Sequence, residues 1–226
     1  MSRSPSPPFR MLVFSKTAGY RHESIPAGIN ALKNFAATSG HIDCDASEEA
    51  SIINPENLAR YRVLVFLHTS GDFLNEAQLS ALKGFVRGGG GFVGIHGTSN
   101  GMPSDTWFKE LVGAGFTNHP EPQDGVIKIE DTADFLTKDF PAEWKWHDEW
   151  YNFRTNPRSN VKVLLSIDEK CYQGGTMGTD HPLAWYHEFE GGRSFYTALG
   201  HFSEAWANER FFSHVTRGIY WTAGVF

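Results

Sequence analysis

The 226-residue sequence has little cysteine, no long hydrophobic run and no block of basic residues. Its two cysteines, Cys44 and Cys171, are too few for a disulfide framework and stand in no ligand spacing such as C-x-x-C. No apolar stretch approaches the roughly 20 residues that a membrane-spanning helix needs. We therefore expect no disulfide framework, no cysteine-based metal site and no membrane partner.

The charge of the chain argues against nucleic acid as its main partner. The formal net charge is −6 and the pI is near 5.9, and a chain without basic patches does not attract phosphate backbones or anionic lipid. Small molecules or proteins remain as partners. The opening MSRSPSPPFR has no apolar core of a secretory signal, which predicts a cytoplasmic protein.

Several local signatures of catalysis are also missing. The sequence has no G-x-S-x-G elbow and no H-E-x-x-H or H-x-x-x-H pair. The glycine run at residues 88–91 is not a phosphate loop, because it precedes an apolar run and has no Lys-Ser/Thr partner. A metal site, if there is one, must therefore use residues far apart in the sequence.

What is present is an alternation of short apolar runs and amphipathic segments. Runs at 11–15, 62–67 and 91–95 are apolar throughout, as buried parallel strands are, and 41–46 predicts a further strand. Segments 25–39 and 75–86 have helical spacing, and Ser24 is the expected cap of the first. This order predicts an α/β fold with one domain at 11–226, preceded by a disordered Ser/Pro-rich tail at 1–10.

The second half is less regular. We expect helices at 106–111 and 210–222, strands at 126–130 and 161–167, and a hairpin of 184–189 with 193–198. Residues 113–120 predict a loop. The aromatic and acidic segment 144–153 fits no helix and is interpreted as an insertion bending over the sheet, either packed there or acting as a lid.

The stretch G-F-V-G-I-H-G places His96 directly after the apolar run at 91–95, between glycines that permit a sharp turn. His22 and His68 follow two other predicted strands. Parallel strands end at one edge of a sheet, where open α/β folds bind ligands, so these three side chains should converge.

We expect other histidines and acids from loops to lie at the same edge of the sheet. These are His119 in the 113–120 loop, Asp148 and Glu149 in the aromatic segment, and His201 after the hairpin. Imidazole and carboxylate groups suit general acid–base catalysis. They would equally suit a divalent metal ion held by His22, His96, His119, Glu149 and His201. The remaining histidines in strands, turns or helix faces are expected to be structural: His41, His181, His187 and His214.

Five separated motifs carry a resemblance over residues 11–226: K-T-A-G-Y-R-H, G-F-V-G-I-H-G, N-H-P, D-E-W-Y, and P-L-A-W-Y followed by G-G-R-S-F-Y-T-A-L-G-H. Together they resemble the ThuA-like family, named for trehalose utilisation. That family is similar in fold to class I glutamine amidotransferases. The resemblance therefore implies a flavodoxin-like three-layer sandwich with a mainly parallel central sheet, carrying here a small aromatic-rich insertion.

The resemblance also bears on chemistry. His96 stands where the amidotransferase fold has its nucleophilic cysteine, and His201 and Glu204 resemble that fold's histidine and glutamate partners. An imidazole cannot form the thioester of that mechanism, so amidotransferase activity is not expected. The family implies a role in carbohydrate metabolism instead.

The resulting hypothesis is an enzyme acting on a disaccharide, a glycoside or a 3-keto-sugar derivative. Its catalytic residues would be His96, His119, His201 and Glu149, and its substrate-binding residues Arg21, His22, Asp148, Tyr151 and Glu204. A non-catalytic sugar-binding or regulatory module and a divalent-metal-dependent hydrolase remain as alternatives. The aromatic content of 14% would suit a ligand pocket or the interface of a homo-oligomer.

Overall fold

The apolar runs of the sequence form the buried centre of a nine-stranded sheet in the computed structural model, which describes residues 7–225. Every residue of β3 (Val63–Leu67) and β4 (Gly91–Ile95) is buried, as are the last four of β1 (Phe9–Phe14). Helices cover both faces of these strands, so apolar side chains are needed on both faces.

The strand order is β2-β1-β3-β4-β11-β10-β9-β6-β7. The first five strands pair in parallel, and the pairings from β11 to β7 are antiparallel. A separate two-stranded sheet joins β5 to β8. The bounds of the other strands are β2 (Ile42–Ser47), β5 (Phe116–Asn118), β6 (Gln123–Ile129), β7 (Glu143–Asp148), β8 (Asn152–Phe153), β9 (Lys162–Ile167), β10 (His181–Phe189) and β11 (Gly192–Thr197).

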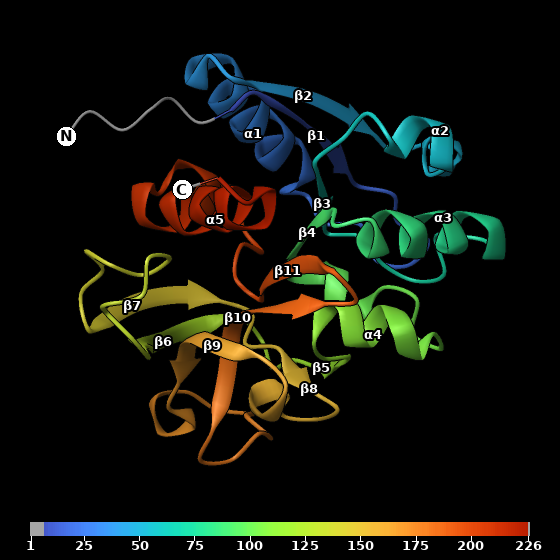
Figure 1. Cartoon of the computed structure of the whole chain (residues 1–226). Coiled ribbons are helices and arrows are strands. Elements are labelled where there is room, and N and C mark those ends of the chain that lie inside the picture. The colour runs from blue at the N-terminus through green and yellow to red at the C-terminus, as the bar shows by residue number, and fades with distance from the viewer. Residues whose placement is uncertain (1–6, 226) are drawn as a thin grey trace.

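Helices α1 (Ile25–Ser39) and α5 (Glu209–Ala223) lie on one face of the sheet, and α3 (Glu76–Arg87) and α4 (Thr106–Val112) lie on the other (Figure 1). The expected three-layer sandwich is therefore confirmed. The remaining helices are short: α2 (Pro55–Leu58) and the 3-10 helices η1 (Ala50–Ile52), η2 (His96–Asn100), η3 (Pro157–Ser159), η4 (Glu169–Cys171) and η5 (Ser203–Ala207).

No helix within residues 7–225 combines the length and apolar character needed to cross a bilayer. The cytoplasmic location, the lack of a nucleic-acid partner and the homo-oligomer stay predictions.

Two local expectations at the start of the chain are wrong. β1 begins at Phe9, so residues 9 and 10 belong to the sheet and not to a disordered tail; residues 1–6 of that predicted tail lie outside the described residues. Ser24 precedes α1, but its side chain makes no capping hydrogen bond. Its hydroxyl lies 3.1 Å from Nε2 of the buried His68 instead, because both residues lie where strands β1 and β3 end.

The aromatic segment is part of the sheet. Residues expected as an irregular insertion form the edge strand β7, paired with β6, and the short strand β8. Trp144 and Trp150 are buried in the core. The segment therefore packs as regular structure, and the end of β7 with the turn after it reaches the carboxyl edge of the parallel strands.

Candidate active site

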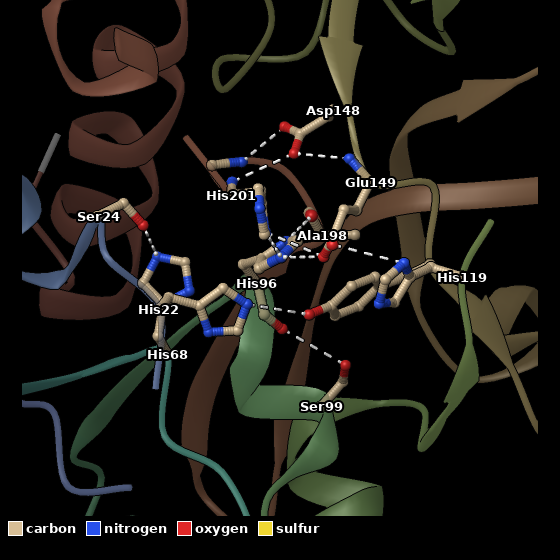
Figure 2. A network of polar contacts seen from close by, with 12 residues as sticks. His22, Ser24, His68, His96, Ser99, His119, Asp148, Glu149, Ala198 and His201 are labelled. Atoms are coloured by element: carbon tan, nitrogen blue, oxygen red, sulfur yellow. Dashed lines mark hydrogen bonds and ion pairs between the residues drawn. The ribbon is translucent and has the colours of Figure 1, made fainter. Parts of the chain in front are cut away.

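Four histidine rings meet where strands β1, β3, β4 and β11 end (Figure 2). The ring of His22 lies 4.4 Å from that of His68 and 4.9 Å from that of His96, measured between centroids. The rings of His96 and His201 are 5.3 Å apart. The parallel topology thus brings together four side chains that are widely separated in the sequence.

His96 stands in a strained turn at the end of β4. Its φ of 47° lies in the left-handed region, as does that of His68 at the end of β3, at 54°. Non-glycine residues adopt this conformation rarely and at a cost. The hydroxyl of Tyr196 donates to the backbone oxygen of His96 at 2.9 Å and helps to hold the turn.

The buried carboxylate of Glu149 lies at the centre of the site. Its Oε2 is 2.9 Å from Nδ1 of His201 and 3.3 Å from Nε2 of His96, and its Oε1 is 3.5 Å from Nδ1 of His119. Glu149 enters from the turn after β7, in the antiparallel half of the sheet. The structure therefore brings the three predicted catalytic histidines to the carboxylate of the fourth predicted catalytic residue, Glu149.

Electrostatics couple Glu149 to His201. Burial by itself would raise the pKa of Glu149, but hydrogen bonds with His201 and His96 outweigh it and hold that pKa below its usual range. Burial likewise opposes the charge on His201, yet the hydrogen bond and the negative charge of Glu149 raise its pKa overall. Both shifts favour a carboxylate paired with a protonated imidazole.

The inner rings stay neutral. Burial lowers the pKa of His22 to about 2, with His96 and His201 adding to the effect, and burial also holds the pKa of His68 well below its usual value. Nδ1 of His96 lies 2.5 Å from the backbone oxygen of Ala198. A carbonyl only accepts, so Nδ1 carries a proton and Nε2 faces Glu149.

Asp148 braces the site. Its carboxylate accepts hydrogen bonds from the N–H groups of Glu149, His201 and Gly200 and from the indole of Trp146. A carboxylate offers about four lone-pair positions. The four donors occupy them, so the geometry makes Asp148 a positioning residue and not the sugar contact that the sequence suggested.

Tyr151 covers His96. The two ring centroids are 4.1 Å apart, and the ring of His119 stacks on the other side of Tyr151 at 5.6 Å. The phenol oxygen lies 3.5 Å from Nε2 of His22. Burial raises the pKa of Tyr151 well above its usual value, so the phenol keeps its proton as a hydrogen-bond donor.

Two predicted substrate-binding residues lie apart from this cluster. The guanidinium of Arg21 pairs with the carboxylate of Glu48 at 2.7 and 2.8 Å. Glu204 is exposed and lines a neighbouring cavity of about 830 Å³ with Phe202 and His147. The carboxylate that contacts His201 is that of Glu149, so the expected pairing of His201 with Glu204 is not observed within the described residues.

Sequence reasoning missed the two hydroxyls that support the cluster. Ser24 carried the signal of a helix cap, and Tyr196 lies in an ordinary strand pattern. Neither gave a local sign of its contact with a histidine, because each contact joins residues far apart in the sequence.

Comparison with solved structures supports the fold. A ThuA-like protein from Bacteroides uniformis aligns with a TM-score of 0.81 at 24% identity, covering 98% of this chain and 94% of that one. A ThuA-like protein from Parabacteroides merdae aligns with a TM-score of 0.80 at 20% identity, covering 96% and 91%. A cytoplasmic protein from Salmonella typhimurium aligns with a TM-score of 0.65 at 13% identity, covering 94% and 98%.

A search of curated proteins finds no match to the sequence. A sequence model of the ThuA family, described as trehalose utilisation, matches residues 10–222. Since this match spans nearly the whole chain and the fold agrees with it, the chain belongs to the ThuA family.

Proposed function

We propose that this ThuA-family chain is a carbohydrate-active enzyme whose substrate is a disaccharide, a glycoside or a 3-keto derivative of either. The family's link to trehalose utilisation supports the substrate class. The observation that carries the catalytic part is the single buried carboxylate of Glu149 in contact with His96, His119 and His201. Imidazoles held by a carboxylate are suited to moving protons at neutral pH.

Elimination from a 3-keto-glycoside is the reaction that fits these groups best. The carbonyl at C3 acidifies the hydrogen on C2. A base removes that proton, the electron pair forms a C1=C2 double bond, and the C1–O glycosidic bond breaks. The departing oxygen takes up the proton, so the step needs no further reactant.

His119 is the candidate base and acid. Its side chain is about one-third exposed, whereas those of His96 and Glu149 are nearly or fully buried. A substrate can therefore reach the His119 ring, which Glu149 contacts from the inner side. The same imidazole would take the C2 proton and return it to the leaving oxygen.

Two donors would stabilise the negative charge that develops on the C3 oxygen. One is His201, whose protonated form Glu149 favours, and the other is the phenol of Tyr151. Hydrogen-bond donors fixed in a site from which water is largely excluded stabilise such charge strongly.

The adjacent cavity would hold the remainder of a disaccharide or glycoside. Its lining combines the aromatic side chains Trp146 and Phe202 with the polar side chains Asp124, Glu204 and Asn208. Its volume lies within the range of about 300–1,000 Å³ common for small-molecule sites. Phe202 directly follows His201 in the chain, and their rings are 4.6 Å apart, so the cavity adjoins the cluster.

The test is turnover by the purified chain. Trehalose, simple glucosides and their 3-keto derivatives would be supplied separately, with products followed by NMR and by the absorbance of the conjugated enone. A His119→Ala variant should lose about 10²–10⁴-fold in kcat. His41→Asn is the matched control, because His41 precedes β2 at the opposite edge of the sheet.

Failure to turn over any of these sugars would reject the enzymatic proposal. Calorimetric binding of a sugar without product would favour a sugar-binding or regulatory module. Full activity in His119→Ala would reject the assignment of this residue.

A further inference from the structure

One ligand atom from each of His22, His96, His201 and Glu149 can be chosen so that all four lie within 4.8 Å of one another. Three of these side chains are buried, and His201 is partly buried. They come from four separate segments, after β1, β4, β7 and β11 (Figure 2). We propose that these four side chains bind one divalent transition-metal ion.

The separations fit a shared ion. Around a metal that holds nitrogen and oxygen at about 2.0–2.1 Å, neighbouring ligand atoms lie roughly 3.0 Å apart in an octahedron and 3.4 Å in a tetrahedron. Nδ1 of His201 is 3.3 Å from Nε2 of His96 and 2.9 Å from Oε2 of Glu149, and Nε2 of His96 is 3.3 Å from the same oxygen. These three atoms form one face of such a polyhedron.

The hydrogen bonding of His96 directs its second ring nitrogen to that face. Its Nδ1–H donates to the backbone oxygen of Ala198, which leaves Nε2, facing Glu149, as the nitrogen that would bind an ion. A metal-binding histidine usually donates its other N–H to a carbonyl or carboxylate in this way, which fixes the ring and the tautomer.

His22 supplies an independent indication. Its side chain is buried, with the residue only 5% exposed, and its Nδ1 has no hydrogen-bond partner among residues 7–225. Burying an imidazole nitrogen without a partner costs free energy. An ion pair between His201 and Glu149 would explain their 2.9 Å contact but would leave Nδ1 of His22 without a partner among residues 7–225.

The donor set indicates the kind of ion. Three imidazole nitrogens and one carboxylate oxygen suit Zn²⁺, Fe²⁺, Co²⁺ or Ni²⁺, whereas Mg²⁺ and Ca²⁺ prefer oxygen ligands alone. His119 contacts the other oxygen of Glu149 and lies outside the set of four. It remains free for proton transfer. His201 bound to the ion through Nδ1 would not carry a proton there, so the ion, as a Lewis acid, would replace protonated His201 in stabilising charge on a sugar oxygen.

The proposal deepens the proposed function by adding an ion to the same site, but its test contains no sugar. Untagged full-length chain would be stripped with a chelator, dialysed, and titrated with ZnCl₂, CoCl₂ and MgCl₂ by calorimetry. Elemental analysis would give the stoichiometry. We expect one Zn²⁺ or Co²⁺ per chain, no comparable Mg²⁺ binding, and a visible absorption spectrum for bound Co²⁺ that indicates nitrogen ligands.

Glu149→Gln and His201→Asn should each weaken Zn²⁺ binding by about 100-fold or more, since loss of a ligand exceeds the usual effect of an outer partner. His41→Asn is the matched control, because His41 precedes β2 at the opposite edge of the sheet, and it should leave the affinity unchanged. Circular dichroism would verify that the variants are folded, and the Co²⁺ spectrum of the unmodified chain tests the site without any variant.

Absence of stoichiometric binding, or unchanged affinity in both ligand variants, would overturn the metal site and leave the proposed sugar chemistry standing. One ion bound with the expected variant effects, but no turnover of any sugar, would reject the proposed function alone.

Discussion

The carboxylate of Asp148 accepts a hydrogen bond from the backbone N–H of Gly200 at 2.8 Å. This bond joins the end of β7 to the segment after β11, and the neighbouring N–H of His201 donates to the same carboxylate at 3.2 Å. Glu149 and His201 enter the site from these two segments. Asp148 therefore fixes the distance between the two groups that form the closest ion pair of the cluster.

Replacing this brace should damage both stability and function. In the unmodified chain the Asp148 carboxylate accepts hydrogen bonds from N–H donors, including the indole of Trp146. In Asp148→Asn one oxygen becomes an NH₂ group, which is itself a donor and cannot accept from them. We expect a loss of about 3 kcal/mol in the free energy of unfolding, because buried hydrogen bonds to a charged group are lost. Displacement of His201 should also lower kcat/KM by about tenfold or more.

Urea denaturation and sugar turnover would measure the two effects of Asp148→Asn. Asp43→Asn is the control for stability. The carboxylate of Asp43 is largely exposed and lies 3.6 Å from the guanidinium of Arg10, so its loss should change stability by less than about 1 kcal/mol. Equal stabilities of the two variants would contradict the bracing role.

The parallel half of the fold was predictable because its signals are local. The runs that became β1, β3 and β4 are apolar on both faces, and such strands end at one edge. That topology was enough to bring His22, His68 and His96 together. In the antiparallel half, the predicted hairpin of 184–189 with 193–198 is confirmed as β10 and β11. The pairing of β9, β6 and β7 was not predictable, since longer connections that carry no turn signal join these strands.

The sequence of β7 does contain a strand signal, but its high aromatic content led to a different prediction. In E-W-K-W-H-D, Trp144, Trp146 and Asp148 alternate with exposed charged or polar residues, which is the period of a strand. The aromatic density favoured a different interpretation, an insertion. The partner of His201 was missed for a related reason: Glu204 is close in sequence, but η5 carries it to the cavity, and Glu149 arrives from 52 residues away.

Gly97 should be required for the position of His22. A Cβ atom at this glycine would lie 3.1 Å from Cε1 of His22 and 3.3 Å from Cα of His68. The backbone of β3 does not yield easily, so the His22 ring must move by a few tenths of an ångström. Gly97→Ala should therefore lower kcat/KM by about tenfold through misplacement of the cluster.

Gly84→Ala is the matched control, because a Cβ in this α3 position meets nothing within 4 Å. Alanine should raise the free energy of unfolding by up to about 1 kcal/mol, since glycine is unfavourable inside a helix, and should leave activity unchanged. Similar activities in Gly97→Ala and Gly84→Ala would show that the close packing of His22 against Gly97 is not needed for activity.

Glu204 should affect binding and not the chemical step if the adjacent cavity holds part of the substrate. Glu204→Gln removes a charge from the cavity wall, whereas the carboxylate in contact with the three histidines is that of Glu149. KM should rise several-fold while kcat stays within about twofold, as expected for a contact made equally in the ground state and transition state. Glu188→Gln, in β10, is the control, and a fall in kcat alone would contradict this role.

His214 should make the fold sensitive to acid. It is fully buried in α5, and neither ring nitrogen has a hydrogen-bond partner within residues 7–225. Burial, with a smaller effect of Arg217, lowers its pKa from 6.5 to about 3. The unfolded chain therefore binds the proton first, so stability present above about pH 6.5 is lost as the pH falls toward 3.

By about pH 5 this residue should cost about 2 kcal/mol of unfolding free energy relative to neutral pH. Urea denaturation at both pH values would compare the chain with His214→Leu and His214→Gln. Both variants remove the titration and should shrink the pH difference by that amount, and His214→Leu should in addition be the more stable of the two at neutral pH, because it buries no unpaired polar atom. An unchanged pH difference in both variants would mean that His214 is not the group whose protonation destabilises the fold.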